Sequence, residues 1–169
     1  MFFLRKTTQQ EQLPIAMSGV RMGERALQIG IDDPSLVGAI AAKVGLSGHA
    51  AVAVGDEAAA ASARNAAEKA GVLVELHVAP LHSLPLAENS FDVVVLHSKN
   101  GWLTSLGDAA RQPILREAHR VLRGGGRLVA IEGPAGSAAD ALPLAGFKAT
   151  RVLAERDGYR FTEGLKPRA

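Results

Sequence analysis

The sequence contains no cysteine. This excludes disulfide bonds, thiolate nucleophiles and zinc sites built from cysteine, and it fits a reducing compartment. Long apolar runs are missing as well, since no stretch approaches the ~20 apolar residues that a membrane-spanning helix needs. The apolar patch that follows Met1 is three residues long, too short for the core of a signal peptide. We therefore expect a cytoplasmic protein with no membrane partner.

Concentrated charge of one sign is also absent. No run of five or more like charges occurs, and the formal net charge is only +2. A groove for nucleic acid would need a stripe of Lys and Arg, so we expect no nucleic-acid partner. The 169 residues, 47% of them hydrophobic, suit one folded domain, in which residues 1–22 form an N-terminal cap segment.

Apolar runs typical of strands alternate with segments of helical periodicity. The apolar runs cover residues 25–30, 49–55, 72–79, 91–98 and 124–133, and the helical segments cover residues 34–45, 56–71, 106–123 and 138–146. Residues 147–166 predict two more strands, joined at the turn signal "RDG". The pattern predicts a doubly wound, Rossmann-like α/β fold with helices on both faces of a mostly parallel seven-stranded sheet and an antiparallel closing hairpin. In such folds the ligand crevice lies where the strand order reverses, here near the first strand.

Proline and glycine mark the expected element ends. Pro34 suits a first helical turn, and Gly45 suits the end of the same helix. Pro113 marks either the true start of the helix in 106–123 or a kink in it. The glycines at 124–126 predict a sharp reversal of the chain after that helix.

Four segments carry a family resemblance: "ALQIG" (26–30), "LPLAENSFDVVVLHS" (84–98), "ILREAHRVLRGGGRLVAIE" (114–132) and "LAGFKATRV" (144–152). Together they make the chain, from about Arg21 to Lys166, similar to class I S-adenosylmethionine-dependent methyltransferases of the small-molecule type. The resemblance implies S-adenosylmethionine as cofactor and a small molecule as methyl acceptor.

The first cofactor loop departs from the family pattern. The family has an acidic residue two positions before its first glycine, and further glycines at alternating positions. In this sequence Gln28 replaces the acid, Gly30 is kept, and Asp32 and Pro34 replace the later glycines. Gln28 can accept a hydrogen bond but brings no charge to the cofactor's ammonium group, which Asp32 or Asp33 could supply. The alternative is that these two aspartates cap the helix that Pro34 begins.

Two further cofactor positions are altered. Gly55 stands where the family has the acid that holds the ribose hydroxyls, and Asp56 directly after it could take that task. The alternative is that Asp56 and the acid after it stabilise the first turn of an Ala-rich helix. Pro80 stands at the position of the adenine contact, where His82 or the serine after it could substitute or simply fill a loop.

The segment "HSKNGW" (97–102) lies where the acceptor of a methyl group would bind. His97 is the candidate base, Asn100 could hydrogen-bond the acceptor, and Trp102 could stack on it or on a cation. The alternative is an ordinary surface loop with a half-buried tryptophan. The other histidines show no metal-ligand spacing, so we expect no metal.

Two main hypotheses follow from these residues. The first is methyl transfer from S-adenosylmethionine to a small acceptor. The second is a catalytically inactive methyltransferase-like fold that serves as a ligand-binding or protein-interaction module, and a third is binding of a different nucleotide at the same crevice. Because residues 133–146 leave little room for a substrate-covering insertion, the site is open, completed by a second copy in a homodimer, or unused.

Overall fold

The computed structural model describes residues 9–168, so the first eight residues of the expected cap segment lie outside it. The helices are α1 (Gln9–Met17), α2 (Ser35–Val44), α3 (Glu57–Ala70), α4 (Asp108–Val121) and α5 (Ala138–Leu144). The strands are β1 (Arg25–Ile29), β2 (His49–Val54), β3 (Glu75–Val78), β4 (Phe91–Ser98), β5 (Leu122–Glu132), β6 (Lys148–Arg156) and β7 (Tyr159–Leu165).

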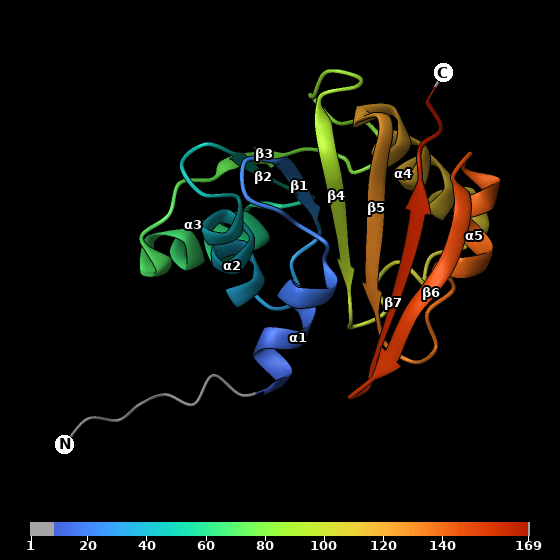
Figure 1. The fold of residues 1–169 in the computed structure, drawn as a ribbon, viewed down its shortest axis with the longest axis horizontal. Coiled ribbons are helices and arrows are strands. Elements are labelled where there is room, and N and C mark those ends of the chain that lie inside the picture. The colour runs from blue at the N-terminus through green and yellow to red at the C-terminus, as the bar shows by residue number, and fades with distance from the viewer. Residues whose placement is uncertain (1–8, 169) are drawn as a thin grey trace.

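The strands form one seven-stranded sheet in the order β3-β2-β1-β4-β5-β7-β6 (Figure 1). Neighbouring strands from β3 to β5 are parallel, whereas β7 runs antiparallel to both β5 and β6. This confirms the predicted doubly wound sheet and its closing hairpin. The chain order reverses between β1 and β4, so their carboxyl ends flank the crevice that such sheets use for ligands.

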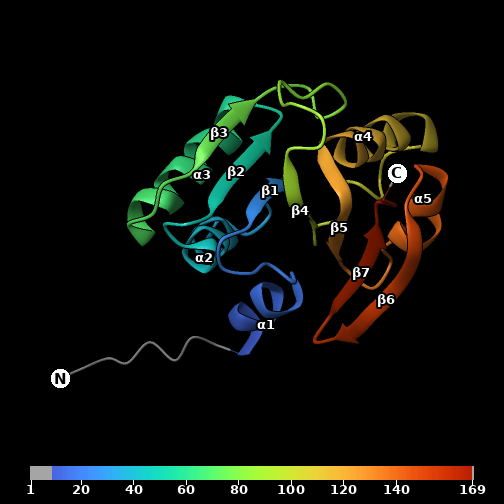
Figure 2. The same cartoon turned by 45° about the horizontal axis from the view of Figure 1, so that its top comes forward.

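Helices cover both faces of the sheet, and each face has its own apolar core. Helices α2 and α3 lie beside β1, β2 and β3, whereas α4 and α5 lie beside β4, β5, β6 and β7 (Figures 1 and 2). Leu36 and Ile40 of α2 pack with Val93 and Val95 of β4 on one face. On the other face, Leu115 of α4 packs in a second cluster with the side chains of β4 that alternate with Val93 and Val95. Strand β4 is therefore buried on both faces, as its unbroken apolar run predicts.

The acidic residues before α2 and α3 act as caps. Asp33 Oδ1 accepts a hydrogen bond from the N–H of Ser35 at 3.0 Å, and Asp56 Oδ1 accepts one from the N–H of Ala59 at 2.8 Å. Both bonds satisfy N–H groups that have no partner within the first helical turn. Asp56 is thus the N-cap of α3, and Asp33 bonds the first N–H of α2 from the position before Pro34, which occupies the N-cap position. Asp32 has a different partner, described below.

Three sequence expectations need correction or adjustment. The glycines at 124–126 do not form a separate turn, because β5 begins at Leu122, directly after α4. Gly125 nevertheless needs its freedom, with a φ of +82° where the pairing of β4 and β5 shifts register. Pro113 lies inside α4 and does not start it. The strand expected over residues 72–79 is shortened to β3.

No helix connects β3 to β4. Residues 79–90 form turns instead, and Leu81, Leu84 and Leu86 pack against the core on the α4 side. The N–H of Leu84 donates to Glu117 of α4 at 2.7 Å, which fixes this connection to the helix. Within residues 9–168, no helix combines the length and the apolar character needed to cross a bilayer.

Candidate functional site

The turn after β1 holds the first group of site residues. Gly30 has a φ of +83°, a conformation that side-chain-bearing residues rarely adopt. The side-chain amide of Gln28 donates to the carbonyl of Gly30 at 3.0 Å, and this hydrogen bond stabilises the turn. Gln28 is only 1% exposed, and its Oε1 has no hydrogen-bond partner among the described residues. The glutamine thus has a structural role in the turn.

His97 lies at the carboxyl end of β4, beside that turn. Its side chain is 2% exposed, and Nδ1 finds no hydrogen-bond partner within residues 9–168. Burial lowers the pKa of His97, although the carboxylates of Asp32 and Asp33 act in the opposite direction. The imidazole is therefore neutral near pH 7 and able to accept a proton.

The loop that follows β4, residues 99–107, folds over the end of β1. The N–H of Asn100 donates to Asp32 Oδ2 at 3.0 Å, and the side-chain oxygen of Asn100 accepts from the N–H of Trp102 at 3.0 Å. The indole Nε1 of Trp102 donates to the carbonyl of His97 at 2.7 Å. A Cβ placed on Gly30 would lie 2.8 Å from Cζ2 and 2.9 Å from Nε1 of Trp102, so the indole lies directly against the glycine.

The backbone of this loop is held by several side chains. Arg111 of α4 donates to the carbonyls of Leu103 and Thr104, at 3.2 and 3.0 Å, and also to that of Leu106. The N–H of Leu103 donates to the buried hydroxyl of Ser98 at 3.0 Å, and the Leu103 side chain is fully buried. The loop is thus a fixed part of the fold, because these three carbonyls have hydrogen-bond donors and the Leu103 side chain is buried in the core.

Glu132, at the end of β5, is a residue that the sequence reasoning missed. Its side chain is fully buried and accepts hydrogen bonds from the Thr104 hydroxyl and from the N–H groups of Ser137 and Ala138, at 3.1, 3.2 and 3.1 Å. These bonds join the loop after β4 to the start of α5. The signal in the sequence was a single acidic residue at the end of an apolar strand.

The closing hairpin contributes Tyr159, which the sequence reasoning also missed. Lys99 places its ammonium 4.2 Å from the centre of the Tyr159 ring and donates to the carbonyl of Gly158. Burial raises the pKa of Tyr159, and the charges of Asp33 and Asp32 raise it further. Because β7 runs antiparallel to β5, the first residue of β7 reaches the edge at which β4 and β5 end.

The remaining predicted residues lie at neighbouring strand ends. Gly55 follows β2, and no heavy atom of the described chain lies within 4 Å of a Cβ placed there. Asp56 caps α3 through Oδ1, and its Oδ2 takes part in no hydrogen bond among the described residues. His82 is exposed in the connection between β3 and β4, and no hydrogen bond within residues 9–168 joins it to the Gly30 turn. The fold therefore brings together Gln28, Gly30, Asp32, His97, Asn100 and Trp102, and places Gly55 and Asp56 at the next strand end.

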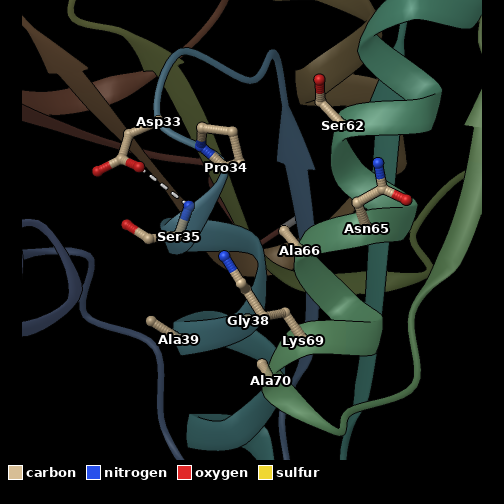
Figure 3. A pocket seen from close by; sticks show the side chains of 10 residues that line it. All are labelled: Asp33, Pro34, Ser35, Gly38, Ala39, Ser62, Asn65, Ala66, Lys69 and Ala70. Atoms are coloured by element: carbon tan, nitrogen blue, oxygen red, sulfur yellow. Dashed lines mark hydrogen bonds between the residues drawn. The ribbon is translucent and has the colours of Figure 1, made fainter.

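A separate groove of about 630 Å³ lies between α2 and α3 (Figure 3). Asp33 and Ser35 lie at its α2 end, and Asn65 and Lys69 line it from α3. It runs along the flank of two helices and does not reach His97, so it is not the crevice at the strand ends.

Two other histidines, one on β2 and one on β3, contact the same glutamate at the side of the sheet away from the closing hairpin. Nε2 of His49 and Nε2 of His77 lie 2.7 and 2.9 Å from the two carboxylate oxygens of Glu75. The sequence did not predict this contact. Throughout the described part of the chain, no group of three or more His, Cys, Asp or Glu residues gathers in a way that could hold a metal ion.

Comparison with known proteins identifies the family. A family model described as a methyltransferase domain matches residues 35–130, more than half of the chain. The chain belongs to the methyltransferase domain family. The match begins after Gly30, so β1 and the turn after it lie outside it. A comparison with curated protein sequences finds no match.

Solved structures support the same fold. A SAM-dependent methyltransferase from Aquifex aeolicus has a TM-score of 0.76 at 17% identity, with 92% of this chain and 88% of that chain covered. PigF with SAH has a TM-score of 0.66 at 20% identity, and the match covers 85% of this chain and 50% of PigF. The [4+2]-cyclase SpnF has a TM-score of 0.70 at 17% identity, with 94% and 80% covered. At such identities the likeness establishes the class I methyltransferase fold.

Class I members of the methyltransferase domain family use S-adenosylmethionine, which joins an adenosine to a sulfonium and an amino-acid arm. The open backbone at Gly55 and the second carboxylate oxygen of Asp56 fit the nucleoside end. The turn at Gly30 lacks a Cβ, as close approach of a ligand requires, but the indole of Trp102 lies against it. At this end of the site the Trp102 indole therefore occupies the space that the glycine leaves free.

Proposed function

We propose that the protein is a cytoplasmic S-adenosylmethionine-dependent methyltransferase that acts on a small-molecule acceptor. The observation that carries the proposal is the position of His97, a buried neutral imidazole beside the Gly30 turn at the strand-order reversal. Family membership and the strand order support it.

Four residues would hold the cofactor. Gly30 and Gly55 give the ligand access to the backbone, because neither carries a Cβ. Gln28 fixes the Gly30 carbonyl, and Oδ2 of Asp56 would accept hydrogen bonds from the ribose hydroxyls, since Oδ1 is taken by the cap of α3. His82 lies in the connection on the adenine side, as the resemblance implies. When bound, the cofactor supplies an electrophilic methyl group on its sulfonium.

His97 would take the proton that the acceptor loses. Its lowered pKa keeps the imidazole neutral near pH 7, so one of its two ring nitrogens is free to accept a proton, and no hydrogen bond within the described chain occupies Nδ1. Asp32 and Asp33 stabilise the imidazolium that forms, through the same charges that act on its pKa. Asn100 and Trp102, on the loop above, would border the acceptor, with Tyr159 across from them on the hairpin.

A second candidate function is a module that binds a ligand or a protein without turnover. The observation that favours it is the contact between Trp102 and Gly30, which occupies the space beside the Gly30 turn and the His97 carbonyl. The fold is compatible with other chemistry, since the solved structures include a protein described as a cyclase.

Calorimetry separates the two candidates. S-adenosylmethionine and S-adenosylhomocysteine are titrated into the wild-type protein and into Trp102→Ala, and the thermal midpoint is recorded with each ligand. Binding must raise the midpoint, because a ligand that binds only the folded state stabilises it. Turnover is then followed as S-adenosylhomocysteine formed in the presence of a panel of small phenols and amines. Absence of heat and of any midpoint shift at ~1 mM ligand, in both proteins, removes the methyltransferase proposal.

A matched pair of variants tests the ribose assignment. Asp56→Ser keeps a hydroxyl that can cap α3 but removes the second carboxylate oxygen, so binding of S-adenosylhomocysteine should weaken about tenfold or more. Glu57→Gln changes the neighbouring exposed carboxylate and should leave binding within about twofold. Equal effects of the two changes would show that Asp56 serves only as a cap.

A further inference from the structure

The indole of Trp102 lies where a cofactor would approach the Gly30 turn. Its Cζ2 and Nε1 lie 2.8 and 2.9 Å from the place of a Gly30 Cβ, so the missing side chain leaves space that the indole uses. Its N–H donates to the carbonyl of His97 at 2.7 Å, which occupies a backbone acceptor at the end of β4. The Trp102 side chain thus occupies the space beside Gly30 and also the carbonyl acceptor of His97, both at the strand-order reversal.

The loop backbone and the indole are held to different degrees. Arg111, Ser98 and the buried Leu103 side chain fix the backbone on either side of Trp102. The Trp102 side chain itself is half-buried and makes one hydrogen bond, the one to His97. Rotation about its side-chain torsions would therefore free the space beside Gly30 without unfolding the loop, and it would break one hydrogen bond and the contacts of the indole with the core on the α4 side.

We propose that Trp102 is a gate on the cofactor crevice: its indole closes the Gly30 turn in the free protein and swings out when S-adenosylmethionine or S-adenosylhomocysteine binds. This inference rests on the proposed methyltransferase function and concerns the regulation of the same site. A protein whose binding-competent state is only partly populated has its apparent affinity reduced by that fraction. The closed indole therefore lowers the affinity of the wild-type protein, and its removal raises it.

A gate and a simple ligand contact predict opposite effects of removing the Trp102 side chain on ligand affinity. If Trp102 stacked on the bound ligand, its loss would weaken binding. Because the gate must open first, Trp102→Ala should tighten binding of S-adenosylhomocysteine about tenfold, the upper range for one lost hydrogen bond plus its packing. Trp102→Phe keeps an aromatic ring but lacks the N–H that donates to the His97 carbonyl. Its affinity for S-adenosylhomocysteine should therefore lie between those of the wild-type protein and Trp102→Ala. Agreement of far-ultraviolet circular dichroism among the three proteins shows that the variants are folded.

Trp102 is the sole tryptophan in the sequence, so its fluorescence reports on the gate directly. Addition of S-adenosylhomocysteine to the wild-type protein should shift the emission to longer wavelength and increase quenching by acrylamide, because the indole moves into water. The affinity is measured in parallel by calorimetry on all three proteins.

Each outcome decides the inference. A red-shifted emission together with tighter binding to Trp102→Ala supports the gate, as does binding that appears only in Trp102→Ala. Binding to the wild-type protein with unchanged emission, or weaker binding to Trp102→Ala, overturns the gate and leaves the proposed function standing. No binding to any of the three proteins overturns the gate and the proposed function together.

Discussion

The carboxylate of Asp32 accepts a hydrogen bond from the N–H of Asn100 at 3.0 Å, although 68 residues separate them in the sequence. This bond joins the turn after β1 to the loop after β4. Asn100 in turn accepts from the N–H of Trp102, so Asp32 acts on the position of the tryptophan through one intermediate residue. Asp32 is therefore an anchor of the loop after β4.

Removal of this anchor should loosen Trp102. In Asp32→Ala we expect a loss of about 0.5–1.5 kcal/mol in the free energy of unfolding, the usual range for one hydrogen bond. Acrylamide should quench Trp102 more strongly than in the wild-type protein. Asp33→Ala is the control, because it removes the cap on Ser35 and leaves the Asn100 bond in place. If acrylamide quenches the Trp102 fluorescence of both variants equally, Asp32 does not position the indole.

The buried His97 and the half-buried His119 should make stability fall as the pH drops below about 6.5. Burial lowers the pKa of both His97 and His119, so the folded protein binds fewer protons than the unfolded chain, whose histidines titrate near 6.5. Their contribution is complete above the unfolded value and is lost as the pH falls from there toward the folded value. Each group can change the stability by at most about 1.4 kcal/mol per pH unit.

Thermal melts at pH 7.5 and 5.5 check this dependence. The loss of midpoint between these two conditions should be smaller in His97→Gln and in His119→Gln than in the wild-type protein, and smallest in the double variant. Carboxyl groups contribute little to the change in this range, because their unfolded values lie near 4. An undiminished loss in the double variant would assign the pH dependence to other groups.

The fold was largely predictable because its signals are local. The apolar run of β4 and the "RDG" turn, where Asp157 and Gly158 have φ values of 53° and 78°, act through neighbouring residues in the sequence. The sheet order then follows from general rules of parallel connections. The reading of residues 124–126 as a turn was wrong because strand pairing extends β5 back to Leu122, which no local signal announces.

The sequence indicated where the candidate residues lie along the chain but not how their side chains are arranged. Strand periodicity placed His97 at the end of β4 and Trp102 in the loop after it. The packing of that indole on Gly30 depends on Arg111 and Asp32, which lie far away in the sequence or on another element. Loop conformations that are set by such distant bonds leave no periodic pattern, and the same holds for Tyr159 on the hairpin.

The ion pair of Glu24 and Arg127 should stabilise the protein at neutral pH and not in acid. Two hydrogen bonds of 2.8 and 3.1 Å join the partners, whose side chains are 14% and 13% exposed. Burial alone would raise the pKa of Glu24, but the hydrogen bonds and charge of Arg127 hold it below its usual value. A carboxyl with a lowered pKa contributes stability above its unfolded value, near 4.3, and loses it as the pH falls through the folded value.

Urea unfolding of Glu24→Gln measures this contribution. At pH 7 we expect a loss of about 1–3 kcal/mol, because a half of the pair is left without its charge partner. Near pH 3 the difference from the wild-type protein should shrink. Glu155→Gln, which breaks the more exposed pair with Arg160, should cost less than about 1 kcal/mol and serves as the control. A pH-independent cost of Glu24→Gln would show that its packing matters and its charge does not.

Glu132 should prove the most sensitive carboxyl group at the rim of the site. Its fully buried side chain accepts three hydrogen bonds, which hold Thr104 of the loop after β4 and the first N–H groups at α5. Glu132→Ala leaves these donors without an acceptor, so we expect a loss of roughly 2–4 kcal/mol in the free energy of unfolding. Glu132→Gln keeps the shape and one acceptor oxygen but turns an N–H toward the Ser137 donor, so its loss should be about half as large.

Differential scanning calorimetry gives the midpoints of both Glu132 variants, with roughly 2–4 °C expected for each kcal/mol in a chain of this size. Because Thr104 lies in the same loop as Trp102, the tryptophan emission of Glu132→Ala should also change, whereas that of Glu155→Gln should not. Equal midpoints for Glu132→Ala and the wild-type protein would mean that water replaces the carboxyl oxygens at no cost. In that case the two loops at the rim are held by Arg111 and the apolar contacts of Leu103, and Glu132 has no part in setting the position of the gate.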